Sequence, residues 1–257
     1  MNLIDVQAGN VQQSGFFCMM SARKSEGYQK KLAWLRGRFD EGLRIKMLDL
    51  KEGGRGFIEY IPGEHAWRAV YAEGYLFIHC LWVVGRSKGK GYGKLLLDEC
   101  LRDARASGFN GVAMLTSERV WLVKKGFLLR QGFQSVGQAP PSFELLVKQF
   151  EPGPLPSLPA DWDERARRYG EGLTVVQSDQ CPYNAAAARA ALEVAQARGI
   201  AARVVELTSS RQVRESAPSA HGVFQIVYNG RLLSYYGLPR KVLEQKLDEP
   251  STTAATS

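Results

Sequence analysis

Apolar residues recur with two different spacings along the first 150 residues. Residues 28–39 place Tyr28, Leu32, Leu35 and Phe39 on one face of a helix, and residues 94–106 repeat this spacing. A third helix is predicted over residues 118–130. Runs of β-branched and aromatic residues predict strands over residues 56–61, 75–84, 111–116, 133–136 and 143–147. The order of these elements predicts a mixed sheet with flanking helices, which is an α/β (α+β) fold.

The chain divides near residue 150. Four prolines lie between Glu151 and Trp162, and proline at this density prevents a helix and removes hydrogen-bond donors from a sheet. We therefore expect a first domain over residues 1–150, a stiff linker over 151–170 and a second domain over 171–250. The second domain reads as strand, helix, strand, helix, two strands joined at Asn229-Gly230, and helix. Residues 251–257, rich in Ser, Thr and Ala, are expected to be disordered.

Positive charge is concentrated in the first domain. The chain has a net charge of +8, and residues 1–150 contain 22 Lys and Arg against 14 Asp and Glu, whereas residues 151–257 contain 12 of each. We expect an anionic ligand or partner on the first domain, and either the phosphates of a cofactor or RNA accounts for it.

Two classes of protein are disfavoured by the sequence. No apolar run is long enough to span a bilayer and the N-terminus lacks an export signal, so we expect a cytoplasmic protein without membrane contact. The four cysteines, at positions 18, 80, 100 and 181, fall at no metal-ligand spacing. We expect reduced thiols and no metal centre.

A glycine-rich turn follows the strand over residues 75–84. Gly89, Gly91 and Gly93 alternate with Lys88, Lys90, Tyr92 and Lys94 and lead into the next helix. Glycine lets the backbone approach a bulky anion, and a helix N-terminus attracts negative charge. The turn is not a Walker loop, and the next strand lacks the acidic residue that closes a dinucleotide site. It predicts a site for a diphosphate.

This turn resembles the signature of the GCN5-related N-acetyltransferase (GNAT) superfamily, [Arg/Gln]-x-x-Gly-x-Gly. Lys88 takes the first position, and Gly91 and Gly93 take the glycines. Phe127 and Gly132-Phe133 resemble a further family segment, so that the similarity covers about residues 55–148. It implies a GNAT fold and an acyltransferase that uses acetyl-CoA or another acyl-CoA. The implied CoA-binding residues are Leu81, Trp82, Val83, Lys88, Gly89, Lys90, Gly91, Tyr92, Gly93 and Lys94.

The resemblance also implies where the chemistry occurs. The strand that ends near Val83 would splay from its neighbour and bind the pantetheine arm, and the backbone N–H near Val83 would stabilise the oxyanion. Strand alternation places His79 on the same face as Leu81 and Val83, which makes His79 the first candidate for the catalytic base and Glu59 the second. Leu128 stands where the family commonly has a tyrosine acid. Tyr92, Cys80 or water would have to replace it, or the thiolate would leave unassisted.

The second domain resembles the thioredoxin and glutaredoxin fold. Its first helix begins at Cys181-Pro182-Tyr183-Asn184, where Asn184 replaces the second redox cysteine, and Gly222 stands at the position of the family's cis-proline. Both differences argue against an oxidoreductase. Cys181 remains either a reactive thiolate at a helix N-terminus or a structural remnant. The combination of the two domains resembles the bacterial YoaP-type acetyltransferases.

Three functions follow from these features. The first is N-acyl transfer from acyl-CoA to a small-molecule amine, with the acceptor held near the N-terminal helix and Trp67. The second uses aminoacyl-tRNA as the acyl donor in natural-product biosynthesis, with RNA contacted by the basic residues Arg23, Lys24, Lys30, Lys31, Arg36, Arg38, Arg44 and Lys46. The third is a non-catalytic protein that binds CoA and docks a partner. The sequence leaves the acceptor and the oligomeric state open.

Overall fold

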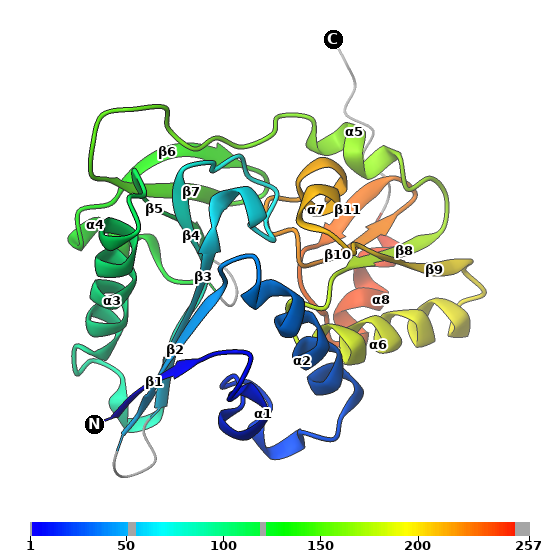
Figure 1. Cartoon of the computed structure of the whole chain (residues 1–257). Coiled ribbons are helices and arrows are strands. Elements are labelled where there is room, and N and C mark those ends of the chain that lie inside the picture. Colours follow the sequence, from blue (N-terminus) through cyan, green and yellow to red (C-terminus); the bar gives the residue numbers. More distant parts are fainter. Residues whose placement is uncertain (1, 51–54, 119–121, 250–257) are drawn as a thin grey trace.

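The computed structural model describes residues 2–50, 55–118 and 122–249 and contains two β-sheets (Figure 1). The first sheet has the strand order β1-β2-β3-β4-β5-β7-β6, and within it only β4 and β5 are parallel neighbours. Its strands are β1 (Asn2–Val6), β2 (Arg44–Asp49), β3 (Arg55–Pro62), β4 (Tyr75–Val84), β5 (Gly111–Ser117), β6 (Gln134–Ala139) and β7 (Phe143–Gln149). The predicted mixed α/β sheet with flanking helices is confirmed.

Helices cover both faces of the first sheet (Figure 1). On one face lies α2 (Glu26–Phe39), which begins after the N-cap Ser25 and buries Tyr28, Leu32 and Leu35, as the helical spacing predicted. On the other lies α3 (Tyr92–Ala106), which buries Leu97, Cys100 and Ala104. The remaining helices of this part are α1 (Val11–Ser14), α4 (Lys125–Arg130) and the short 3-10 turns η1 (Met20–Ala22), η3 (Gly63–His65) and η4 (Gly85–Ser87).

The first part of the chain differs from the prediction in two places. The strands β1 and β2 were not predicted, although they pair with each other from Asn2↔Asp49 to Val6↔Ile45. The helix predicted over residues 118–130 is shorter, because α4 begins only at Lys125. Residues 119–121 of that prediction lie outside the described part of the chain.

The second sheet has four strands in the order β11-β10-β8-β9. It is built from β8 (Leu173–Gln177), α6 (Asn184–Ala197), β9 (Ala202–Glu206), α7 (Ser210–Ser216), β10 (Phe224–Tyr228), β11 (Arg231–Ser234) and α8 (Arg240–Asp248). This is the order of elements that the sequence predicted, including the turn at Asn229-Gly230, where both residues have positive φ.

The segment between the sheets is more than a linker. Residues 162–167 form α5 (Trp162–Arg167), with Trp162 and Arg165 buried, so the stretch predicted as linker over 151–170 contains a packed helix. Ahead of it, Ser157 pairs with Tyr71 of the first part. One apolar cluster includes residues from both sheets, such as Phe77 and Val176. The division at residue 150 therefore runs through a continuous core, and the predicted tail over 251–257 lies outside the described residues.

Candidate active site

The first sheet opens between β4 and β5. Their parallel pairing runs from Tyr75↔Gly111 to Ile78↔Met114, although β4 continues to Val84 and β5 to Ser117. The pairing of β3 with β4 slips at the same level, from Tyr60↔Ile78 to Glu59↔Cys80, so that His79 is an extra residue in β4. Such a bulge bends its strand and ends regular pairing. The predicted splay of β4 from its neighbour is confirmed.

The glycine-rich loop lies at the end of this opening. Gly85, Gly89 and Gly91 have φ values of +66, +77 and +82°, and a Cβ added at any of them would meet no atom within 4 Å. Gly91 is the N-cap of α3, and no side chain caps the first turn of that helix. The backbone amides of this turn therefore remain available to an anion, in a loop that only glycine adopts without strain.

The lysines around the loop are exposed, and Lys94 contacts Asp98 over 2.6 Å on the first turns of α3. Gly93 lies against the ring of Phe127, whose atoms come within 3.6 Å of a Cβ built there. This contact joins the two segments on which the resemblance to acetyltransferases rested. A CoA diphosphate fits this loop by charge and by the space above the glycines.

The bulge changes which face each β4 side chain occupies. Phe77 and Cys80 pack with the core on the α2 face, whereas Leu81 and Val83 pack with the α3 face. His79 contacts Trp34 and Phe77 on the α2 face. The prediction that His79 shares a face with Leu81 and Val83 is therefore wrong, because an extra residue in a strand breaks its two-residue period.

The structure brings His79 and Glu59 together. The backbone N–H of Trp67 donates to Nε2 of His79 over 2.9 Å, so the imidazole proton resides on Nδ1, 3.1 Å from Glu59 Oε1. Burial lowers the pKa of His79 to about 4, although its hydrogen bond to Glu59 acts in the opposite direction. His79 is a neutral donor with both ring nitrogens engaged.

Glu59 is equally enclosed. Lys31 of α2 forms an ion pair with its Oε2 over 2.7 Å, and both side chains are 3% exposed. Burial alone would raise the pKa of Glu59, but Lys31 and the hydrogen bond from His79 together lower it below its usual range. A carboxylate held ionised by a buried cation is a weak proton acceptor.

Two further residues, one from each part of the chain, complete this network. Gln180, which follows β8, donates to Glu59 Oε1 over 2.8 Å, and the buried guanidinium of Arg68 donates to the carbonyls of His79 (2.9 Å) and Trp67 (2.7 Å). Arg68 thus binds the carbonyl of the bulge residue itself. The sequence did not predict Arg68 or Gln180, because neither lies in a motif or near Glu59 along the chain.

The catalytic-base role of His79 or Glu59 stays a prediction. His79 has no exposed surface and Glu59 is 2% exposed, and His79 Nε2 and both carboxylate oxygens of Glu59 already face a donor or a cation. Trp67, predicted near the acceptor, is 1% exposed and packs edge-on against Trp34 in the core. The prediction that Trp67 contacts the acceptor is wrong for this arrangement.

The acid that would protonate the leaving thiolate is absent from its usual place. Leu128 is fully buried in the core on the α3 face. Burial raises the pKa of Cys80 to about 11, and its Sγ lies 3.9 Å from Nε2 of Gln180. Cys80 stands on β4 directly after the bulge, and Tyr92 begins α3 beside the glycine loop.

Burial raises the pKa of three thiols, those of Cys18, Cys80 and Cys181. Burial raises the pKa of Cys18, and the proximity of Cys80 and Cys181 raises it further. Burial also raises the pKa of Cys181, despite a hydrogen bond from the backbone of Tyr183. The four cysteines are free, and the raised pKa of Cys181 favours the structural remnant over the reactive thiolate. Among the described residues, no three His, Cys, Asp or Glu side chains are arranged to hold a metal ion.

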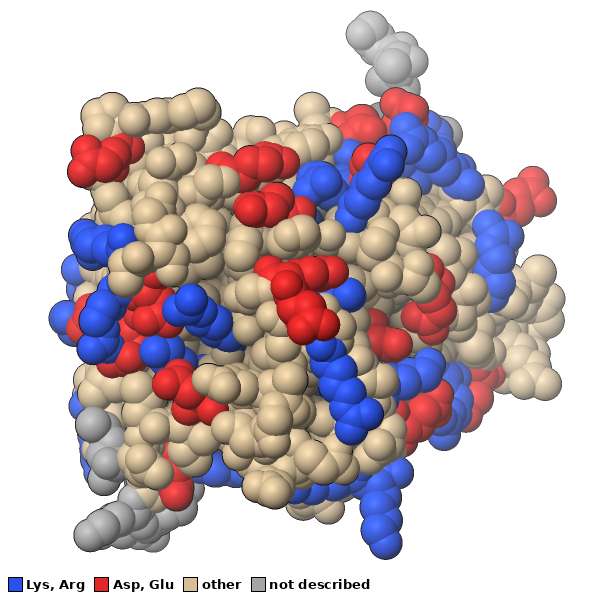
Figure 2. Space-filling model, viewed as in Figure 1, with Lys and Arg blue, Asp and Glu red and all other residues tan. Residues whose placement is uncertain are grey.

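Ion pairs neutralise much of the basic segment over residues 23–46. Lys46 contacts Asp5, Glu99 and Asp103, and Lys31 is buried against Glu59. Figure 2 shows Lys and Arg interspersed with Asp and Glu across this side of the molecule. The arrangement does not support the interpretation of this segment as an RNA-facing surface.

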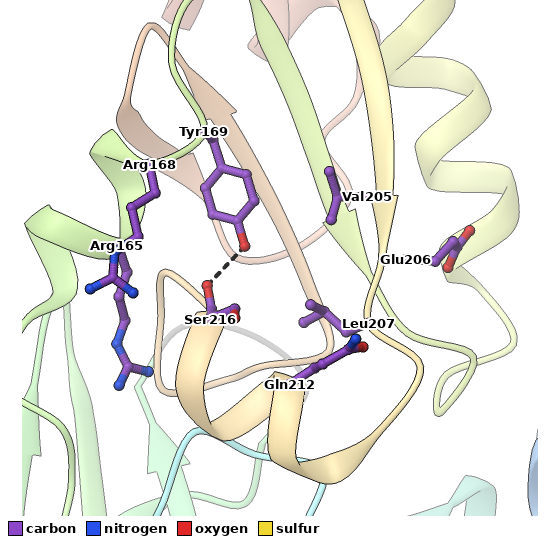
Figure 3. Close-up of a pocket in the computed structure, with 8 residues that line it drawn as sticks. All are labelled: Arg165, Arg168, Tyr169, Val205, Glu206, Leu207, Gln212 and Ser216. Carbon is purple, nitrogen blue, oxygen red and sulfur yellow. Dashed lines mark hydrogen bonds between the residues drawn. The ribbon is translucent and has the colours of Figure 1, made fainter.

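A separate pocket lies in the second sheet, between α5, β9 and α7 (Figure 3). Tyr169 crosses it and donates to the carbonyl of Ser216 over 2.8 Å, while Arg165 and Arg168 form one side. Both arginines are paired with Asp161. The pocket lies apart from the β4–β5 opening and contributes nothing to it.

Comparison with known proteins finds a family model that matches the first part of the chain. Residues 16–133 match the model of the Acetyltransferase (GNAT) family. This segment is a GNAT acetyltransferase family domain, and the chain is an acyltransferase whose acyl donor is an acyl-CoA. Within the described residues, no helix combines the length and apolar character needed to cross a membrane.

One relative covers both sheets. The chain is 29% identical over 237 residues to the "Uncharacterized N-acetyltransferase YoaP" of Bacillus subtilis (strain 168), covering 90% of this chain and 92% of the relative.

Two solved acetyltransferase structures are similar to about three fifths of the chain. The aminoglycoside 6'-N-acetyltransferase from Enterococcus faecium is 15% identical with a TM-score of 0.44, covering 60% of this chain and 99% of its own. The ribosomal-protein-alanine N-acetyltransferase from Brucella melitensis is 13% identical with a TM-score of 0.42, covering 58% of this chain and 100% of its own.

Proposed function

We propose that this protein transfers an acetyl or another acyl group from acyl-CoA directly to the amine of a small-molecule acceptor. The observation that carries the proposal is the opening between β4 and β5, which leads to a loop of left-handed glycines at an uncapped helix N-terminus. The pantetheine arm would pair with the edge of β4 beyond Ile78. The diphosphate would lie on the amides of Gly89, Gly91 and the first turn of α3.

The acyl carbonyl would then lie beside the part of β4 that follows the bulge. An amine nitrogen attacks this carbonyl, the oxyanion is stabilised by the backbone N–H near Val83, and the thiolate of CoA leaves. The proton of the amine is lost before the attack. This assignment follows from the burial of both His79 and Glu59, which here act as positioning residues that hold the bulge in β4.

The second sheet would serve as support rather than as a redox unit. We infer that this part has a thioredoxin-like fold and that the domain boundaries lie near residues 150 and 170. Asn184 occupies the position of a second redox cysteine and donates to the carbonyls of Ser178 and Val223 over 2.9 and 3.0 Å. Because the side chain of Asn184 holds a loop to a strand, it supports a structural role for the second part of the chain.

The direct test is turnover with acetyl-CoA and a panel of primary amines. Release of the CoA thiol should require both substrates, and mass spectrometry should find the acceptor heavier by one acetyl group. Binding of CoA without product from any amine, aromatic or aliphatic, would contradict the proposal.

A further inference from the structure

The α2 face of the opened sheet is the side from which an acceptor can approach the thioester. On the opposite face Leu81 and Val83 of β4 pack into the core beneath α3. On the α2 face the β4 residues beyond the bulge are Cys80 and Trp82, which stand opposite Glu59 and Phe57 of β3. Trp82 is 37% exposed although it lies on a strand of the sheet.

An aromatic layer covers this region. Phe57 stacks on Phe17 with 4.4 Å between ring centroids, and Arg55 lies over the outer side of Phe17 at 5.4 Å. Because Phe57 and Trp82 are cross-strand partners, their side chains share a face. Phe57 is 2% exposed and lies beneath this layer, so Phe17 and Trp82 are the rings that present an apolar surface near the opening.

The loop that carries Phe17 has an unusual backbone. Phe17 and Met19 have φ values of +81 and +51°, a region that side-chain-bearing residues rarely adopt. Each such residue costs on the order of 1–3 kcal/mol, and such costs concentrate at ligand sites. This conformation places Phe17 against the sheet, stacked on Phe57.

The start of α6 in the second part of the chain packs against the same region. The carbonyl of Pro182 lies on Gly27 of α2, where a Cβ would come within 1.9 Å of it. Gln180 is bonded to Glu59. The next aromatic residue, Tyr183, is 56% exposed, and the backbone of Met19 bonds its phenol oxygen.

We propose that Tyr183 of the second part forms one wall of the acceptor site, and that the acceptor is a primary amine on an aromatic or apolar body. This inference rests on the proposed function and adds the substrate class and the residue that selects it. Tyr183 would contact the body of the acceptor, opposite the surface of Phe17 and Trp82. Aromatic rings bind such groups through apolar contact and edge or stacking geometry.

The chemistry of an apolar wall agrees with the burial of the two candidate bases, His79 and Glu59. Apolar surroundings disfavour the ammonium form of an amine, so the acceptor binds with its nitrogen lone pair available. The nitrogen forms the new bond to the acyl carbon, the carbon–sulfur bond breaks, and the electron pair leaves with the CoA sulfur. The second proton of the nitrogen is released to solvent as the amide forms.

The test compares 2-phenylethylamine with ethanolamine as acceptors for acetyl-CoA. The wild type should prefer 2-phenylethylamine in kcat/KM. Tyr183→Ala should lower kcat/KM for it by about tenfold or more, as expected for loss of one aromatic contact, while KM for acetyl-CoA is unchanged. Tyr183→Phe should restore the wild-type value. Tyr71→Ala, at a tyrosine that is 41% exposed and paired with the linker, is the matched control.

A binding measurement separates this inference from the proposed function. Saturation-transfer NMR should detect 2-phenylethylamine on the wild-type enzyme loaded with CoA and not on Tyr183→Ala. Turnover with unchanged kinetics in Tyr183→Ala, or a preference for ethanolamine, would overturn the inference and leave acyl transfer standing. CoA-loaded wild type that binds no 2-phenylethylamine would overturn it as well.

Discussion

The amide of Gln180 donates to the carboxylate of Glu59 over 2.8 Å, although 121 residues separate them along the chain. The bond joins the loop after β8 to the strand that pairs with the bulged part of β4. Glu59 in turn accepts from His79, whose carbonyl is held by Arg68. The opening that would receive the acyl donor is therefore braced by both parts of the chain.

Removing the cation of this network should be strongly destabilising. Lys31→Met leaves the Glu59 carboxylate buried without its ion-pair partner, and we expect a loss of about 3–5 kcal/mol in the free energy of unfolding. Urea denaturation measures it. Adding Glu59→Gln to Lys31→Met should recover a large part of the loss, because the uncompensated charge is then gone. Equal stability of the single and double variants would contradict this account of Glu59.

The close approach of α2 and the start of α6 should depend on one glycine. Gly27→Ala places a Cβ 1.9 Å from the carbonyl of Pro182, and we expect a loss of about 1–3 kcal/mol from the forced shift. Gly37→Ala is the matched control in the same helix, since a Cβ there meets nothing within 4 Å. Because alanine favours a helix more than glycine, that variant should gain about 0.5–1 kcal/mol. Thermal unfolding of both variants at one pH decides the point.

Stability should fall as pH decreases through the range set by His79. Its folded pKa of about 4 lies below the ordinary 6.5, so the unfolded chain binds a proton first as the pH falls. The contribution of neutral His79 is present above pH 6.5 and is lost between about 6.5 and 4, amounting to about 3 kcal/mol. His79→Gln should flatten the pH dependence of the free energy of unfolding in this range. The half-buried His221, with a pKa of about 3, is present in both proteins and contributes equally to them. An identical slope in both proteins would argue against a buried neutral His79.

The pH dependence of turnover should report the amine rather than an enzyme base. If the acceptor binds with its proton already lost, log(kcat/KM) rises with unit slope up to the pKa of the free amine. A base of the enzyme that acts on a bound ammonium would give a plateau above its own pKa. Stopped assays with 2-phenylethylamine between pH 6 and 10 distinguish the two. A plateau of log(kcat/KM) that begins near neutral pH would show that an enzyme residue acts as the base, and would contradict this account.

The sequence predicted the features that depend on neighbouring residues. The strand over 75–84 and the glycine turn before α3 are local patterns, and both are present. The bulge at His79 was missed because the prediction assumed that side chains alternate between the two faces along the whole of β4. The shift in its pairing with β3 cannot be read from the sequence. Gln180, Arg68 and Pro182 were missed because their roles arise only when the second part packs on the first. The strands β1 and β2 were missed as well, although they complete the sheet.

The central claim is that the loop from Gly85 to Gly91 binds the diphosphate of the acyl donor. Calorimetric titration of CoA into Gly91→Val tests it most directly. Valine strains the left-handed backbone at φ +82° and obstructs the space above it. We expect affinity to fall by about tenfold or more, because the amides of this turn carry the anion contacts. Gly108→Val, at φ +74° and equally unobstructed beyond the end of α3, should bind CoA like the wild type. Unchanged CoA affinity in Gly91→Val would contradict the claim.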